Sequence, residues 1–381
     1  MAVEDSCADG SGGATPIVPE PTSITAFVGW APSGPRDGAK HIQGWSDYER
    51  LFGGLHHASP LGYAVSHYFA NGGREAYIVR LAGPEPYEPL QPGTDAFRES
   101  LFPAPPCDGD PRGGIHCLEQ VDAFNLLCVP GLTDLATLQE LVRFCRDHRA
   151  FLIADAPDIP DGAAVEPVPG EDASYAAIYY PWLQFADPLD GGGLRAIPPS
   201  GAVAGVYVRN DADRGVWKAP AGSVASLVDV AGLTQTMTDQ QSGVLNARGV
   251  NTLRTFPTHG PVVWGARTCA ADPEWKYVPV RRTALHIEQS LHHGLKRAVF
   301  EPNDEPLWAQ IRRVADEFMV GLFRQGAFQG STSREAWFVK CDRNTMTQHD
   351  IDSGNLIVVV GFAPLKPAEF VILSIRLPVG D

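Results

Sequence analysis

Two helical patterns follow one another in the last third of the chain: RRTALHIEQSLHHGLKRAV at residues 281–299 and EPLWAQIRRVADEFMVGLFRQ at residues 305–325. In both, apolar residues recur every three or four positions, as in a helix that buries one face. Proline near the start of the second pattern and Gly326 after its end are typical helix boundaries. The inward residues we expect are Ala284, Ile287, Leu291 and Leu295, and then Leu307, Ile311, Val314, Phe318 and Leu322.

Three strand patterns follow these helices. They lie at residues 336–339, 356–362 and 370–377, and they are short and rich in β-branched and aromatic residues. The last two are separated by APLKP (residues 363–367), which favours a connecting turn. The last third therefore predicts a domain of two long helices and a small sheet.

Strands and helices alternate in the first half of the chain. Predicted strands at residues 23–31 and 76–81 flank two short helices, and the second helix begins at Ser59-Pro60. A second unit of this kind covers residues 124–154. A strand at residues 176–185 and a helix capped by Ser200 follow. The alternation of strands and helices predicts an α/β fold.

Composition divides the chain into five segments. The insertion is placed where eight prolines fall within residues 83–120 with little periodicity. We expect a flexible N-terminal arm at 1–21, the first part of the body at 22–82, the insertion at 83–120, a middle domain at 121–270 and a C-terminal domain with its arm strand at 271–381.

The charge balance excludes several partners. The chain has 381 residues, of which 30 are basic and 45 acidic, for a net charge of −15. Such a chain is poorly suited to nucleic acid, which binds through lysine and arginine. It contains no apolar run near the ~18–20 residues of a membrane-spanning helix, so we expect no direct membrane insertion. The acidic start and the seven scattered cysteines favour a reducing cytoplasm.

The sequence contains no recognisable catalytic motif. There is no P-loop, no G-x-S-x-G elbow and no H-E-x-x-H pair. His286 and His293 share a helix face but lack further ligands, and Gly191-Gly192-Gly193 lies among prolines and acids typical of a plain loop. We therefore expect a protein that is not an enzyme, with no catalytic residue, no cofactor and no metal site.

Long stretches of the chain resemble the contractile tail sheath family. The clearest are VFEPNDEPLW (299–308), FRQGAFQG (323–330) and GFAPLKPAEF (361–370), with further support from residues 63–81 and 198–222. The resemblance covers most of residues 22–377 and includes the sheaths of phages, antifeeding prophages and insecticidal virulence cassettes.

The resemblance implies an α/β body with a mixed sheet and helices on the sheet faces, a small loop-rich insertion and extended terminal arms. It also implies a mechanical function. A sheath subunit polymerises with itself, as stacked hexameric rings or a helix, around an inner tube protein in an extended, metastable state. It then contracts and drives the tube through a target envelope. Baseplate and tail terminator or cap proteins are the further partners implied. Assembly is expected in the cytoplasm, as part of a phage tail or phage-tail-like particle that is released or anchored to the cell.

In this family, terminal arms add strands to the sheets of neighbouring subunits. The resemblance places the C-terminal arm strand at Glu369, Phe370, Val371, Ile372, Leu373, Ser374, Ile375, Arg376 and Leu377. An internal hairpin with residues 356–362 is the alternative, and the two can coexist. Many sheaths begin with a P-G-V-Y-x-x-E arm, which this chain lacks, so only Ile17 and Val18 remain as an N-terminal arm.

Basic residues in the C-terminal domain are candidates for contact with an acidic tube surface. They are Arg281, Arg282, Lys296, Arg297, Arg312 and Arg313. A solvated helix face is the alternative for the same residues. Two other functions stay open: a tail terminator, cap or baseplate-proximal sheath paralogue, and an α/β hydrolase-type enzyme.

Overall fold

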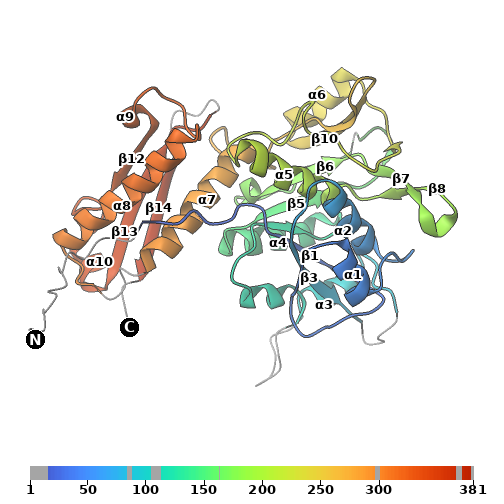
Figure 1. Ribbon diagram of the computed structural model, residues 1–381, viewed down its shortest axis with the longest axis horizontal. Coiled ribbons are helices and arrows are strands. Elements are labelled where there is room, and N and C mark those ends of the chain that lie inside the picture. Colours follow the sequence, from blue (N-terminus) through green and yellow to red (C-terminus); the bar gives the residue numbers. More distant parts are fainter. Residues whose placement is uncertain are drawn as a thin grey trace, which may run out of the picture. The chain divides into compact units, whose positions relative to one another are not determined.

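A computed structural model describes residues 16–83, 88–103, 113–162, 164–296, 301–365 and 371–378. The chain divides into two compact units, Pro21–His286 and Ile287–Asp381, and the described residues 16–20 belong with the latter (Figure 1). We call them the core unit and the C-terminal unit. The boundary at His286 lies inside a helix, whereas the sequence predicts a boundary at residues 270/271.

The core unit is built on an eight-stranded mixed sheet. Its order is β11-β10-β6-β5-β4-β1-β3-β2. The six inner strands run parallel, and β2 and β11 pair antiparallel at the two edges. The strands are β1 Thr25–Trp30, β2 Lys40–Ile42, β3 Ala76–Leu81, β4 Leu126–Cys128, β5 Phe151–Asp155, β6 Ala176–Tyr180, β10 Val250–Phe256 and β11 Gly260–Val263.

Both faces of this sheet are covered by helices. All six residues of β1 are buried, without polar alternation, as in a parallel sheet packed on two sides. Val28 packs into one apolar core and Phe27 into the other. The helices α3 Asp95–Leu101, α4 Leu135–Asp147 and α6 Asp239–Ala247 lie on the first side, and α1 Trp45–Phe52, α2 Pro60–Ala70 and α5 Ser200–Arg214 on the second.

Helices α2 and α5 pack closely because α5 carries two glycines at the contact. A Cβ added at Gly201 would lie 2.2 Å from the Ala64 carbonyl oxygen, and one at Gly205 would lie 2.5 Å from that of Tyr68. The predicted start of α2 is confirmed, since Ser59 caps it and Pro60 is its first residue. Ser200, in contrast, is not the cap of α5: it is the first helical residue.

Two predicted segments differ from the structure. The insertion at 83–120 contains helix α3 and the 3-10 helix Gly114–Gln120, and their apolar residues join the core. The prolines around them conceal this short periodicity. The predicted strand at 176–185 is two strands, β6 and β7 Leu183–Asp187, because Pro181 interrupts it. Strand β7 belongs to a small sheet with β8 Gly193–Ile197 and β9 Gly232–Leu233.

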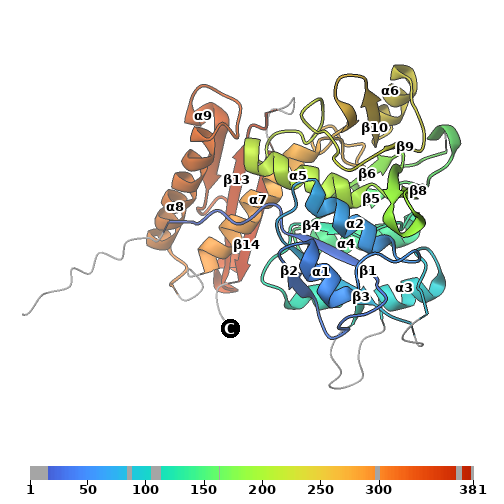
Figure 2. The same cartoon turned by 45° about the vertical axis from the view of Figure 1, so that its right-hand side comes forward.

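The C-terminal unit contains a three-stranded antiparallel sheet of order β12-β13-β14, with β12 Trp337–Lys340, β13 Asn355–Phe362 and β14 Val371–Pro378. Helix α8 Glu305–Arg324 packs beside this sheet (Figure 2) and buries the predicted face. Trp337 donates a hydrogen bond from Nε1 to Asp316 at 2.8 Å and so ties β12 to α8. Short helices α9 Ser333–Ala336 and α10 Gln348–Asp352 flank the strands, and α7 Val278–Leu295 spans the boundary of the two units in sequence.

Candidate inter-subunit surfaces

Strand β14 presents a long open edge. It pairs with β13 along its whole length, from Val371 opposite Phe362 to Pro378 opposite Asn355. On its other side, the described part of the chain supplies no ladder partner. Alternate backbone N–H and C=O groups of this edge are therefore available to another strand.

This strand accounts for most of the predicted C-terminal arm. Residues 371–377 lie in β14, whereas Glu369 and Phe370 lie outside the described residues. The internal hairpin, which the sequence leaves open as an alternative, is present in the structure. The hairpin occupies one side of β14 only, so it is compatible with a further strand on the other side.

Strand β12 forms the opposite edge of the same sheet. It has four residues, half as many as the eight of β14, and its last residue is the exposed Lys340. Short edge strands that carry lysine are a common protection against unwanted pairing. The edge of β14 is therefore the better candidate for strand addition.

The predicted N-terminal arm residues have different environments. Ile17 is 7% exposed and packs within the C-terminal unit, whereas Val18 is 72% exposed. Neither residue belongs to a strand in the structure. The segment around Ile17 is thus held by its own C-terminal unit.

Arg281 and Arg282 are not available for a tube contact, which corrects that part of the prediction. Arg281 is 5% exposed, and its guanidinium lies 3.4 Å from the ring centre of Trp275 and 4.3 Å from that of Tyr175. It also donates a hydrogen bond to Ser174 Oγ at 2.7 Å. The stacking contacts and the hydrogen bond thus hold this side chain inside the core unit.

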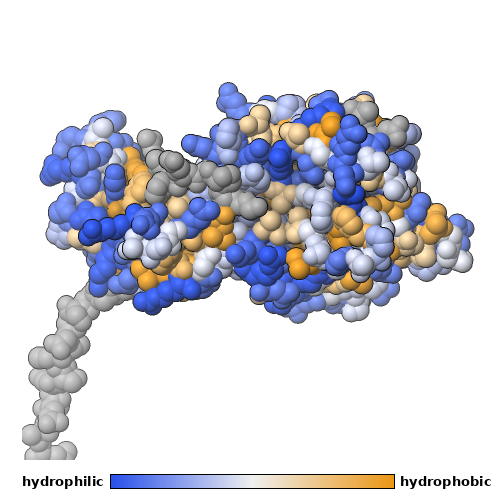
Figure 3. Space-filling view, turned by 90° about the horizontal axis from the view of Figure 1, so that it is seen from above, coloured by the Kyte–Doolittle hydropathy of each residue, from blue (hydrophilic) through white to orange (hydrophobic). Residues whose placement is uncertain are grey.

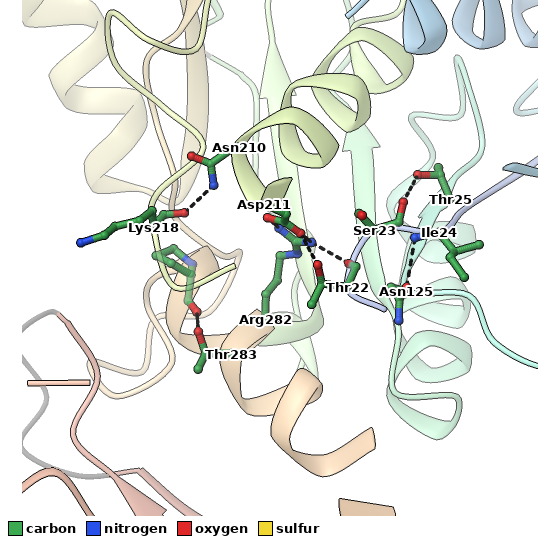
Figure 4. Close-up of polar contacts among 11 residues, drawn as sticks. Thr22, Ser23, Ile24, Thr25, Asn125, Asn210, Asp211, Lys218, Arg282 and Thr283 are labelled. Atoms are coloured by element: carbon green, nitrogen blue, oxygen red, sulfur yellow. Dashed lines mark hydrogen bonds and ion pairs between the residues drawn. The ribbon is translucent and has the colours of Figure 1, made fainter. Parts of the chain in front are cut away.

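Arg282 forms a buried ion pair with Asp211 (Figure 4). Both side chains are 3% exposed. Arg282 donates from Nη1 to Asp211 Oδ1 at 2.9 Å and from Nη2 to Oδ2 at 2.6 Å, in a bidentate pair. Nη2 also donates to the Thr22 carbonyl at 2.8 Å, and the Thr22 hydroxyl donates to Asp211 at 2.7 Å. The cluster joins α7, α5 and the segment that leads into β1.

The other predicted basic residues lie in the C-terminal unit. Lys296 and Arg313 are exposed. Arg312 is half-buried, pairs with Glu305 at 2.7 Å and donates to the Cys341 carbonyl, and Arg297 lies outside the described residues. The prediction did not include Arg324, which is exposed on α8 eleven residues after Arg313 and so nearly the same helix face. Figure 3 shows polar side chains over much of this unit, around smaller apolar patches.

The carboxyl end of β5 is filled by the chain itself. Asp155 accepts hydrogen bonds from the Gly131 amide at 2.9 Å, the Ser200 amide at 2.7 Å and the Ser200 hydroxyl at 2.8 Å. Burial raises the pKa of Asp155 to about 6, although these hydrogen bonds oppose the shift. Helix N-termini at this end of parallel sheets hold anionic ligands in many α/β enzymes. Here a buried carboxyl group takes that place at the start of α5.

The histidines and the glycine run that the sequence raised as weak site candidates are accounted for by the fold. His286 is 8% exposed, and His293 Nδ1 pairs with Glu20 at 2.9 Å. Gly191 and Gly192 lie in the connection between β7 and β8, and Gly193 is the first residue of β8. Among the described residues, no group of three or more histidine, cysteine, aspartate or glutamate side chains could hold a metal ion, and no helix has the length and apolarity to cross a bilayer.

His67 is a buried titratable group in α2. It is 1% exposed, and neither ring nitrogen has a hydrogen-bond partner within the described part of the chain. Its ring packs edge-on against Phe185, with 4.7 Å between ring centres. Burial lowers the pKa of His67 to about 4, and the Asp229 carboxylate only partly opposes this shift.

Replacing His67 with leucine is expected to reduce the acid sensitivity of the core unit. The folded-state pKa lies below the ordinary value of 6.5, so the folded protein binds fewer protons than the unfolded chain. The free energy of unfolding is therefore highest above pH 6.5. It falls as the pH drops toward 4, by roughly 2 kcal/mol at pH 5. Denaturant unfolding of both proteins at pH 7.5 and 5 measures this. A stability difference that does not change with pH would contradict it.

The sequence matches two family models. The model of the phage tail sheath protein central domain matches residues 116–269, and the model of the phage tail sheath C-terminal domain matches residues 270–377. The two matches adjoin and together cover residues 116–377, which include β14 as far as Leu377.

Two solved structures share the fold along nearly the whole chain. The PVC sheath complex of an extracellular contractile injection system, in its contracted state, is 30% identical, with a TM-score of 0.75 over 98% of this chain and 97% of that chain. The anti-feeding prophage helical sheath in its contracted state is also 30% identical, with a TM-score of 0.74 and the same coverage.

A relative known from its sequence matches over a shorter range. A protein of Pseudomonas aeruginosa (strain UCBPP-PA14), described as a prophage major tail sheath protein, is 24% identical over 230 residues. The match covers 58% of this chain and 56% of that protein. The chain therefore spans little more than half the length of this relative.

Proposed function

The chain belongs to the phage tail sheath family and has the fold of contractile sheath subunits, and from this premise we propose that it polymerises around an inner tube in an extended, metastable state. Contraction of the polymer drives the tube through a target envelope. The observation that carries the proposal is the match to contracted sheath subunits over 98% of the chain at 30% identity. The work comes from the difference in free energy between two packings of the same subunits.

Strand addition at β14 supplies the link between copies. Its eight residues form the longer open edge of the C-terminal sheet. A ladder of main-chain hydrogen bonds does not depend on the side chains that repack around it. Such a link can therefore persist while the rest of each subunit changes its neighbours during contraction.

The inner tube contacts the sheath through the exposed basic residues of the C-terminal unit, Lys296 and Arg313. Exposed ion pairs contribute about 0–1 kcal/mol each. Many such contacts hold a polymer on a tube, and each one is weak enough to break when the sheath widens.

Replacing Lys296 and Arg313 with glutamate is expected to lower co-sedimentation of the sheath with purified inner tube several-fold. The loss should be larger at low salt, where exposed charges are less screened. Arg143→Glu is the matched control, because Arg143 is an exposed arginine on α4 of the core unit. An equal loss in the control would count against a tube contact at these two residues.

The remaining partners follow from the same proposal. A sheath requires a baseplate, where contraction is triggered, and a terminator or cap at its other end. Assembly takes place in the cytoplasm, in a phage tail or a phage-tail-like particle. The mechanism assigns no bond chemistry to the chain, and the hydrolase alternative loses support because Asp155 and Ser200 fill the sheet end that an enzyme would use.

Negative-stain electron microscopy of the purified protein with its inner tube tests the proposal. Striated tubes of two diameters are the expected result. Single rings that cap a tube would favour the terminator alternative instead. Monomers that neither coat the tube nor polymerise would overturn the proposal.

A further inference from the structure

The segment Pro16–Glu20 is bound in a groove on the C-terminal unit. The segment Pro16–Glu20 contacts α7 and α8, and its only buried apolar side chain is Ile17, at 7% exposure against 72% for Val18. A pocket of about 160 Å³ beside Ile17 is lined by Pro16, Ile17 and Pro19 of the segment and by α8 residues that include Val314, Phe318 and Leu322. We call this surface of α7 and α8 the groove.

Gly294 makes room for Ile17 on α7. A Cβ added at Gly294 would lie 2.8 Å from Ile17 Cγ1 and 2.9 Å from Cγ2, closer than real Cβ contacts. The isoleucine side chain therefore lies directly against the backbone of α7. No residue larger than glycine fits at position 294 unless the segment moves.

Polar contacts fix the same segment at Glu20. The Glu20 amide donates a hydrogen bond to Ser290 Oγ at 3.0 Å, and the Glu20 carboxylate pairs with His293 Nδ1 at 2.9 Å. Ser290, His293 and Gly294 are spaced i, i+3 and i+4, so they lie on one face of α7. One helix face thus receives an apolar side chain, a backbone amide and a carboxylate from five consecutive residues.

Prolines make this segment stiff. Pro16 and Pro19 lie within it and Pro21 follows it, so the chain loses less conformational freedom when it binds. The bound segment forms no sheet ladder, and the contacts that hold it come from its own C-terminal unit. Its geometry is therefore that of an intramolecular attachment.

We propose that Pro16–Glu20 is an intramolecular clamp, which stays in the groove of its own chain in the assembled sheath. Residues Ile17 and Val18 then do not act as a strand-forming arm, and the link between copies runs through β14. The part of this inference that concerns the assembled state rests on the proposed sheath function.

A disulfide between Ile17→Cys and Gly294→Cys tests the clamp. The Cβ atoms at these positions are 3.2 Å apart, close to the separation of about 3.5–4.5 Å found in disulfides. Ile17→Cys removes the two Cγ atoms that a Cβ at position 294 would clash with, so the double variant does not require the segment to move. After oxidation of the assembled polymer, denaturing electrophoresis without reductant should show a cross-linked species of monomer mass. A ladder of dimers and larger species, absent from both single-cysteine variants, would overturn the clamp.

Hydrogen exchange of the unassembled chain gives an independent test. The Glu20 amide should be protected, and Ser290→Ala should raise its exchange rate about tenfold or more, because its acceptor is lost. Fast exchange at Glu20 in the unmutated chain would overturn the clamp. This measurement needs no polymer, so failure of the clamp and failure of the sheath function can be told apart.

Discussion

Proline at one of two adjacent positions of β14, Leu373 or Ser374, is expected to abolish long polymers while leaving the monomer folded. Successive N–H groups of a strand point to opposite sides, so one of the two faces β13 and the other faces the open edge. Proline is tolerated on an edge strand where its missing N–H faces away from the ladder. At the other position, it removes a hydrogen bond to β13 and destabilises the C-terminal unit by roughly 1–3 kcal/mol, because the acceptor on β13 loses its partner.

The pair of variants separates assembly from folding. Thermal unfolding identifies the proline variant whose monomer keeps its stability, and electron microscopy then measures its polymer length. Leu373→Ala and Ser374→Ala are the matched controls, because they shorten the side chain but keep the N–H. Normal polymers from the stable proline variant would contradict strand addition at this edge.

Replacing Arg282 with alanine is expected to lower the free energy of unfolding of the core unit by about 3–5 kcal/mol. The substitution leaves the Asp211 carboxylate buried, with both hydrogen bonds from the guanidinium removed. It also removes the hydrogen bond to the Thr22 carbonyl, which leads into β1. Denaturant unfolding with a probe in the core unit, such as Trp30, measures the loss.

A double variant shows whether the ion pair itself is needed. Arg282→Leu combined with Asp211→Leu removes both charges and should recover much of the stability that either single change loses, because no buried charge remains unpaired. A change of less than about 1 kcal/mol in Arg282→Ala would show that the cluster does not hold α7 to α5.

Local patterns in the sequence predicted much of the fold. The face of α8 and the start of α2 were confirmed because both depend on nearby residues, a 3–4 spacing and a Ser-Pro boundary. The sequence also predicts the hairpin of β13 and β14 as an alternative, because a proline-containing turn separates two apolar runs. The structure contains this hairpin. The interruption at Pro181 was also visible in the sequence, and a strict rule against proline inside a strand would have found it.

Tertiary contacts determine the environments of the residues that sequence reasoning misplaced. Two adjacent arginines on a helix usually indicate a solvated face, yet Arg281 and Arg282 are buried against Trp275, Tyr175 and Asp211. Asp211 is 71 residues away in sequence, and nothing local indicates that pairing. Ser200 likewise does not cap α5 as expected. Its hydroxyl donates a hydrogen bond to Asp155, 45 residues away.

The attachment of Pro16–Glu20 illustrates the same limit. An isolated Ile-Val pair between prolines suggests a short arm, and its position follows from Gly294, 277 residues further along the chain, where the absent side chain accommodates Ile17. Gly294 lies inside a helical pattern, and such a glycine often has a packing reason. That was the signal in the sequence that could have located the groove.

Cryo-electron microscopy of the assembled particle before and after contraction tests the central claim most directly. The account predicts this polypeptide in a helical layer outside the tube in both states, with the two units keeping their folds while the layer widens and shortens. In both maps, a strand from a neighbouring copy should lie along the open edge of β14. A map that places the chain elsewhere in the particle, or in a layer whose diameter never changes, would contradict the account.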